Sequence, residues 1–223
     1  MGSEEEALLN RTDFTQPALF ALEVALYRLW ESFGVTAEIV VGHSVGEIAA
    51  AHIAGVFELE DAVRLVAARG RLMQALPSQG AMASIGTHSE AVLATLTELG
   101  LEGSVGIAGQ NSPKQTVVSG DAPGVAQVVA HFKNAKVKAT ELTVSHAFHS
   151  HLMDPMLEAF RQEISGLLFF EPKLTVVSNV SGKKAGNELC STDYWVNHAR
   201  ESVQFLDGIQ AAVAEGATRF VEV

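Results

Sequence analysis

The sequence predicts an α/β protein with a parallel-sheet core and a smaller α+β unit inserted in the middle of the chain. Two observations support this prediction. In the first and last thirds of the chain, short apolar, β-branched runs lie among longer segments of helical periodicity. Between residues 80 and 144 the expected order becomes strand, helix, strand, strand, helix, strand. The length of 223 residues and the hydrophobic content of 48% suit this organisation.

The core is expected over residues 1–78 and 145–223. Thr15 and Pro17 predict the beginning of its first helix, which carries leucines and Trp30 at helical spacing and ends at Gly34. The expected core helices cover residues 18–33, 47–54, 59–76, 152–168 and most of 194–213. The expected core strands cover residues 39–41, 174–178 and 220–223.

The insert is expected over residues 79–144. Its strands are predicted at 81–85, 105–108, 115–119 and 136–144, and its helices at 90–99 and 125–132. This order is the split βαββαβ arrangement of a small ferredoxin-like unit.

The motif Gly42-His43-Ser44-Val45-Gly46 is the most informative feature of the chain. It lies between an apolar strand and a helix-like stretch, and a serine at such a strand–turn–helix junction forms a nucleophile elbow. Glycines allow the backbone to pass where a Cβ would clash. The hydroxyl then lies at a helix N-terminus, where free N–H groups and the helix dipole stabilise an oxyanion. The motif therefore predicts acyl chemistry at Ser44.

A nucleophilic serine needs a base, and three histidines lie together where the insert rejoins the core: His146, His149 and His151. Their spacing does not decide which one faces Ser44. Asp154 is the nearest acid in sequence, but no acid is obviously placed to complete a triad. A dyad in which a backbone carbonyl orients the imidazole is equally compatible with the sequence.

Arg69 is the second informative residue. On a helical wheel of the segment 59–76, it falls in the middle of the apolar stripe, whereas Arg64 and Arg71 fall on the polar side. An unpaired arginine in that position is costly. Two interpretations remain open: an internal ion pair with a protein carboxylate, or a guanidinium held to bind a substrate carboxylate in a bidentate fork.

Composition excludes several classes of function. A net charge of −11 argues against nucleic acid or an anionic membrane as a partner. We find no apolar run of membrane-spanning length and no signal peptide. The single cysteine, Cys190, has no metal-ligand spacing around it, and we expect no metal site and a reducing, cytoplasmic location.

Stretches along nearly the whole chain resemble, in order, motifs of the acyltransferase domains of modular type I polyketide synthases. These domains are related to malonyl-CoA:acyl carrier protein transacylases. The stretches are Thr15–Phe20, Gly42–Glu47, Arg69-Gly70, Asn111–Pro113, Val118–Gly120, His146–His149, Tyr194–Val196 and Phe220–Val223. The resemblance implies a hydrolase-like α/β core with a ferredoxin-like insert, in agreement with the pattern above.

The same resemblance implies roles for individual residues. Ser44 resembles the nucleophile, His149 the catalytic base, and Arg69 the arginine that grips the malonyl carboxylate. The backbone N–H of Val45 resembles an oxyanion donor, and the backbone carbonyl at His198 resembles the group that orients the histidine.

The resemblance also assigns residues to the substrate pocket. Gln16 and His43 are expected to line this pocket. The stretch His146-Ala147-Phe148-His149 resembles the form that accompanies malonyl selectivity, whereas a Tyr-Ala-Ser-His type accompanies methylmalonyl. Physically, the Phe148 ring would fill the space that an α-methyl group needs, and one methyl group gives only partial selectivity.

The implied reaction moves a malonyl unit from malonyl-CoA to the phosphopantetheine thiol of an acyl carrier protein, by a ping-pong mechanism through Ser44. It needs no bound metal or cofactor, and its partners are the carrier protein and neighbouring synthase domains. A serine thioesterase or esterase is the first alternative, although a hydrolase has no need of Arg69 in an apolar helix face.

A catalytically impaired fragment with a structural role is the second alternative. The resemblance implies a preceding strand with a Gly-Gln-Gly-x-Gln turn and a following Gly-Pro turn with further helix, and this chain contains neither. The sequence therefore suggests a domain truncated at both ends.

Overall fold

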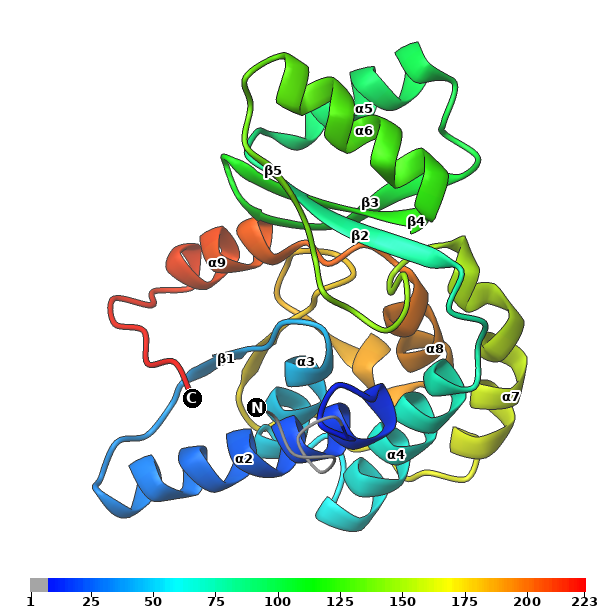
Figure 1. Ribbon diagram of the computed structural model, residues 1–223. Helices are drawn as coiled ribbons and strands as arrows, with labels where there is room; N and C mark the ends of the chain where they lie inside the picture. The colour runs from blue at the N-terminus through cyan, green and yellow to red at the C-terminus, as the bar shows by residue number, and fades with distance from the viewer. Residues whose placement is uncertain (1–7) are drawn as a thin grey trace.

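Two sheets of different kinds organise the chain (Figure 1). The structure, a computed structural model, describes residues 8–223. In the larger unit, β1 (Ile39–Val41) and β6 (Thr175–Val177) pair in parallel. In the smaller unit, four antiparallel strands lie in the order β3-β4-β2-β5. A parallel and an antiparallel sheet among helices confirm the predicted α/β class.

Helices surround the parallel pair in the larger unit. They are α2 (Thr12–Ser32), α3 (Val45–Ile53), α4 (Leu59–Gln74), α7 (Asp154–Ile164), α8 (Thr192–Arg200) and α9 (Phe205–Ala214), with short 3-10 turns at His151–Met153 and Asn187–Cys190. One apolar core joins all of these helices except α9, which contacts the parallel strands, and Phe57, Phe160 and Trp195 are among its largest buried side chains. Burial of such residues supplies most of the stability of a fold of this kind.

The smaller unit runs from β2 to β5. Its elements are β2 (Gly80–Ile85), α5 (Ser89–Leu99), β3 (Val105–Ser112), β4 (Gln115–Asp121), α6 (Ala122–Asn134) and β5 (Ala139–Glu141). Both helices lie on the face of the sheet that is turned away from the larger unit (Figure 1). The strand order is that of a split βαββαβ unit. The exact domain boundaries at residues 79 and 144 stay a prediction.

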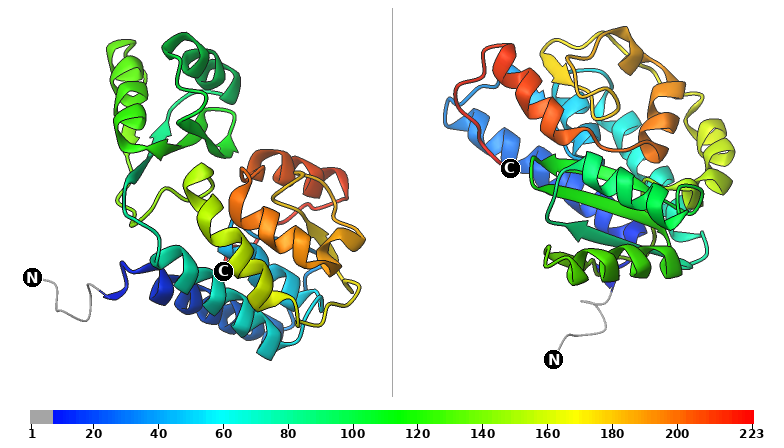
Figure 2. Two further views of the ribbon diagram at one scale, coloured as in Figure 1. Left: turned by 90° about the vertical axis from the view of Figure 1, so that its right-hand side faces the viewer. Right: turned by 90° about the horizontal axis from the view of Figure 1, so that it is seen from above.

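The inner face of the antiparallel sheet contacts the larger unit. Met82, Ala108 and Val117 form a small apolar cluster on the sheet, and Phe148 packs against both this cluster and the main core. Figure 2 shows the chain crossing between the units and the smaller unit standing over the larger one. Within residues 8–223, no helix combines the length and the apolar character needed to cross a membrane.

Helix α2 differs from its prediction in where it begins and in which face is buried. It begins at Thr12, and the Thr15 hydroxyl donates to the Arg11 carbonyl (2.8 Å) instead of capping the helix. The buried residues are Thr12, Gln16 and Phe20, whereas Leu22 and Trp30 are exposed. Helical spacing identifies an apolar stripe, but contact with the neighbouring helices decides which face is buried.

At the end of the chain, one prediction is confirmed with an added detail and one is wrong. Residues 194–213 are mostly helical, as predicted, but the non-helical residues 201–204 separate α8 from α9. Val203 pairs with the edge of the antiparallel sheet through bonds to the Ala108 carbonyl (2.9 Å) and from the Gln110 N–H (3.0 Å). Residues 220–223 form no strand, because no strand within residues 8–223 pairs with them.

Candidate active site

The site is built on the turn between β1 and α3. Ser44 adopts φ 51° and ψ −117°, a conformation that costs a non-glycine residue on the order of 1–3 kcal/mol. A Cβ at Gly42 would lie 2.1 Å from the Glu47 nitrogen, so only glycine fits there. A Cβ at Gly46 would make ordinary contacts with the Glu23 side chain. The turn thus presents the Ser44 hydroxyl beyond the end of the strand, as in a nucleophile elbow.

Ser44 meets one of the three clustered histidines. Its Oγ lies 2.7 Å from Nε2 of His149, and Nδ1 of His149 lies 2.7 Å from the Glu201 carbonyl oxygen. A carbonyl oxygen can only accept, so Nδ1 carries the proton of the neutral ring. The lone pair of Nε2 is therefore free to accept the Ser44 proton.

The prediction that the backbone carbonyl of His198 orients the catalytic histidine is wrong. The Glu201 carbonyl, three residues later, has this position. Helix α8 directs the His198 carbonyl along its own axis, whereas Glu201 caps that helix in an extended conformation (φ −75°, ψ 158°) and turns its carbonyl toward His149. The His198 side chain is buried instead, with Nε2 3.5 Å from the Glu47 carboxylate and its ring 6.5 Å from that of His149.

The other candidates for base or acid are engaged elsewhere. Nε2 of His146 lies 2.8 Å from the Leu76 carbonyl oxygen, and His151 lies 3.4 Å from the Asp121 carboxylate. Asp154 pairs with Arg200. The geometry is therefore a Ser–His pair with a backbone carbonyl as the third member.

Arg69 is buried, as its place on the helical wheel predicts, and only 3% of its surface is exposed. Its Nη2 donates to Ser44 Oγ (3.1 Å) and its Nη1 to Oε1 of Gln16 (2.5 Å). Gln16 is held by its own bond to the Thr12 hydroxyl (2.7 Å). Among residues 8–223, no carboxylate pairs with Arg69, and its Nε has no partner. The guanidinium is thus a buried cation with neutral protein neighbours.

Burial sets the protonation of the site. It lowers the pKa of Arg69 to about 10, so the guanidinium stays charged near neutral pH. Burial, followed by the charge of Arg69, holds the pKa of His149 well below its usual 6.5. His149 is therefore neutral at pH 7 and able to accept a proton.

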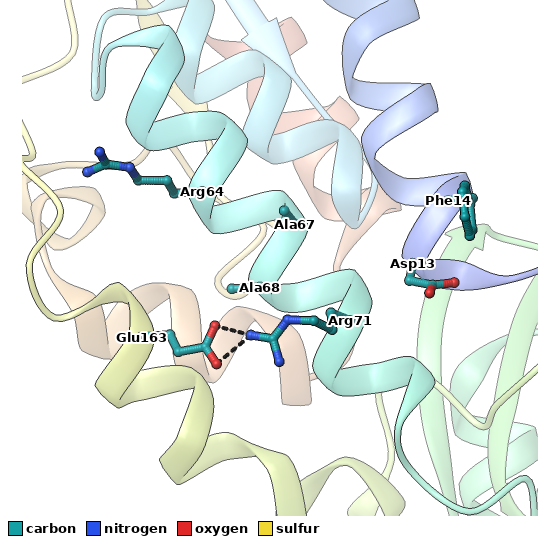
Figure 3. Close-up of a pocket in the computed structure, with 7 residues that line it drawn as sticks. All are labelled: Asp13, Phe14, Arg64, Ala67, Ala68, Arg71 and Glu163. Atoms are coloured by element: carbon teal, nitrogen blue, oxygen red, sulfur yellow. Dashed lines mark hydrogen bonds and ion pairs between the residues drawn. The ribbon is translucent and has the colours of Figure 1, made fainter.

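Arg71, on the same helix, is an exposed arginine that has a carboxylate partner, in contrast to Arg69. It projects from the opposite side of α4 and binds both carboxylate oxygens of Glu163 on α7 (Figure 3). The pocket drawn there is lined by Asp13, Phe14, Arg64, Ala67, Ala68, Arg71 and Glu163 and does not include Ser44. Arg69 and Arg71 therefore differ in burial and in partner.

The remaining predicted residues surround the Ser–His pair. His43 is exposed; its Nε2 lies 2.9 Å from Oδ1 of Asn111 on β3, and its ring lies 5.2 Å from that of Phe205. The Val45 N–H, in the first turn of α3, has no acceptor among the described residues. Phe148 packs against the apolar cluster of the antiparallel sheet and against the main core, and its ring centre lies 6.1 Å from that of His146.

Sequence reasoning missed a buried polar group behind the turn. Asn179 follows β6 and bonds to the backbone of Gly42 and Ser44. Glu47, fully buried on α3, accepts from the Asn179 N–H (2.7 Å) and from the Tyr194 hydroxyl. A signal existed: a polar residue directly after a buried parallel strand lies at the same sheet edge as the turn after β1.

An elbow serine bonded to a neutral histidine on a mixed α/β fold is typical of enzymes that handle acyl groups. The sequence profile described as "Acyl transferase domain" matches residues 1–223. The chain belongs to this family and is an acyltransferase domain.

Relatives with known names agree. Polyketide synthase GfsA of Streptomyces halstedii is 58% identical over 217 residues, which cover 97% of this chain and 3% of that protein. Mycoketide-CoA synthase of Mycobacterium tuberculosis is 47% identical over 223 residues, covering 100% of this chain and 5% of that protein. The chain thus spans only a small part of the length of these two relatives.

Solved structures show the same fold. The acyltransferase domain from the second module of the salinomycin polyketide synthase is 49% identical, with a TM-score of 0.92, covering 100% of this chain and 51% of that chain. A malonyl-CoA:acyl carrier protein transacylase from Xanthomonas oryzae is 36% identical, with a TM-score of 0.89, covering 98% and 71%. The chain therefore spans about half of the solved synthase domain.

Proposed function

We propose that this domain transfers a malonyl unit from malonyl-CoA to the phosphopantetheine thiol of an acyl carrier protein through an acyl-enzyme at Ser44. One observation carries the choice of substrate: Arg69 is a buried cation 3.1 Å from the Ser44 hydroxyl, without a carboxylate partner among the described residues. A substrate carboxylate would supply the missing anion through charge-assisted hydrogen bonds.

The position of Arg69 also limits the length of the acyl group. The guanidinium contacts the nucleophilic oxygen itself, so a carboxylate that it binds lies close to the carbon under attack. In malonyl, a single methylene separates the carboxylate from the thioester carbonyl. Acyl groups that place the carboxylate on a longer chain, or that have none, match this geometry less well.

In the first half-reaction, Ser44 Oγ attacks the thioester carbon while Nε2 of His149 accepts the hydroxyl proton. The Val45 N–H supports the oxyanion at the N-terminus of α3. When the tetrahedral intermediate collapses, the C–S bond breaks and the proton passes from His149 to the departing thiolate of coenzyme A. The second half-reaction repeats these steps in reverse with the thiol of the carrier protein.

The choice between malonyl and methylmalonyl is proposed to involve Phe148. Its partly buried side chain packs against both the main core and the apolar cluster of Met82, Ala108 and Val117. His146, anchored on the Leu76 carbonyl, holds the start of the same stretch. A methyl branch on the α-carbon would have to displace this aromatic ring.

The partners follow from the acceptor chemistry and from the relatives. Polyketide synthases are the named relatives of this chain, and a malonyl-CoA:acyl carrier protein transacylase is among its structural neighbours. We propose that an acyl carrier protein and neighbouring synthase domains are the partners here as well. The proposed steps use the Ser–His pair, Arg69 and the Val45 N–H, and they call for no metal or bound cofactor.

Partition of the acyl-enzyme between a thiol and water tests this proposal. The protein is mixed with malonyl-CoA and either a holo-carrier protein or pantetheine, and malonyl-thioester and free malonate are quantified. Transfer should exceed hydrolysis by at least about tenfold, and Ser44→Ala should abolish both. Release of malonate as the main product in the presence of thiol would instead support a thioesterase.

A further inference from the structure

Each of the four polar atoms of Asn179 makes a hydrogen bond to a residue near the active site. Its side-chain Oδ1 accepts from the Ser44 N–H (2.7 Å), and its Nδ2 donates to the Gly42 carbonyl (2.7 Å). Its own N–H donates to Glu47 Oε2 (2.7 Å), and its carbonyl accepts from the Gln204 N–H (2.8 Å). Only 3% of the residue is exposed.

The chemistry of these partners fixes the orientation of the amide. A backbone N–H can only donate and a carbonyl can only accept, so Oδ1 must face Ser44 and Nδ2 must face Gly42. The side chain therefore bridges the two ends of the turn on either side of His43. This turn is the strained one, with Ser44 at φ 51°, and strained backbone persists only where surrounding contacts hold it.

The main chain of Asn179 contacts the segment that orients His149. Gln204 belongs to the non-helical segment 201–204, and the Glu201 carbonyl in that segment accepts from Nδ1 of His149. Asn179 thus contacts both the backbone that carries the nucleophile and the segment that orients the base. The Glu47 carboxylate, fully buried, anchors Asn179 from the first turns of α3.

We propose that Asn179 is a positioning residue that fixes the Ser44 hydroxyl relative to Nε2 of His149. It contacts neither Oγ of Ser44 nor the imidazole, so it acts through the backbone of the turn and through segment 201–204. It also occupies the Ser44 N–H, whereas the Val45 N–H has no acceptor among the described residues. This inference rests on the acyl-enzyme proposed above.

Rapid-quench acylation by malonyl-CoA, read as intact mass, tests the role of Asn179. The variants are Asn179→Ala, which removes both side-chain bonds, and Asn179→Asp, which keeps an acceptor for Ser44 but loses the donor to Gly42. Asn197→Ala is the control, because that asparagine is exposed on α8. The assay separates the rate constant, the half-saturating malonyl-CoA concentration and the final acylated fraction.

The expected result is a rate constant about tenfold to a hundredfold lower for Asn179→Ala, with unchanged half-saturation and final acylated fraction. Asn179→Asp should also be slow, and Asn197→Ala should match the parent. An unchanged rate constant, or a lower acylated fraction at parental rate, overturns the inference, as does failure of both Asn179 variants to fold. A parent protein that is never acylated would instead refute the proposed function.

Discussion

His149 shows how its surroundings select one histidine among three. The three histidines of 146–151 are indistinguishable by spacing, yet only His149 reaches the Ser44 hydroxyl, because Glu201 holds its other nitrogen. The backbone at His149 itself has a positive φ of 55°. Sequence patterns predicted that a base lies in this stretch, but the choice among the three depends on tertiary contacts.

The lowered pKa of His149 predicts the pH dependence of acylation. The base must be neutral to accept a proton, and burial keeps it neutral below the ordinary pKa of 6.5. The acylation rate constant should therefore remain constant as the pH falls from 8 to 6.5 and decline only at lower pH. Rapid-quench rates across this range measure the midpoint. A midpoint at or above 6.5 would contradict the assignment of a buried, neutral base.

Phe148 predicts a change in selectivity. Phe148→Ser removes the ring between the two sheets and should raise the use of methylmalonyl-CoA relative to malonyl-CoA by about tenfold, the scale of one methyl group. Competition between the two thioesters, with products separated by mass, measures the ratio. Phe170→Ser, at a partly exposed phenylalanine, is the control. An unchanged ratio for Phe148→Ser would place selectivity elsewhere.

At the scale of secondary-structure elements, the sequence predictions were most accurate where neighbouring residues alone determine the element. The strand over 39–41 is present as predicted, and Gly55 ends the helix after it with a φ of 84°. The buried face of α2 and the interruption at 201–204 were missed. Val203 pairs with a strand almost a hundred residues earlier in the sequence, and no local pattern encodes such a contact.

The contact between α2 and α3 predicts an effect on stability. Glu23 of α2 lies beside Gly46 of α3, and one of its buried oxygens has no hydrogen-bond partner within residues 8–223. Burial raises the pKa of its carboxyl to about 6. A raised pKa means that the folded state loses stability as the pH rises from about 4.5 through 6. Glu23→Gln should stabilise the protein at pH 8 by roughly 1 kcal/mol, after allowance for partial exposure.

Urea unfolding at pH 8 and pH 4.5 measures this effect. The advantage of Glu23→Gln over the parent should largely disappear at pH 4.5, where the parental carboxyl is protonated in the folded state and about half protonated in the unfolded state. Glu98→Gln, at an exposed position of α5, should show no such dependence. An equal difference at both pH values would mean that the charge of Glu23 is not the cause.

At the scale of the whole molecule, residues from several elements meet around one hydroxyl. β1 and α3 present Ser44, α4 supplies Arg69, α2 supplies Gln16, and the stretch after β5 supplies His149. The antiparallel sheet takes part as well, since β3 binds segment 201–204. Motifs predicted most of these residues, whereas the roles of Asn179 and Glu47 and the carbonyl of Glu201 were missed, because they depend on contacts between segments far apart in the sequence.

Competition between malonyl-CoA and acetyl-CoA for Ser44 tests most directly whether Arg69 binds the substrate carboxylate. Parent, Arg69→Ala and Arg71→Ala proteins are mixed with equal amounts of both thioesters, and the adducts are weighed by intact mass and located by peptide mapping. Arg71→Ala is the matched control, because that arginine pairs with Glu163 on the other side of α4. Thermal unfolding of each variant reports its stability.

The parent and Arg71→Ala should carry mainly malonyl on Ser44. Arg69→Ala should lose malonyl acylation by about a hundredfold, the scale of a lost buried charge pair, while acetylation stays at the parental level or rises. The contrary result is an equal loss of malonyl and acetyl adducts in Arg69→Ala together with a marked drop in thermal stability. It would show that Arg69 is a structural residue and does not bind the malonyl carboxylate.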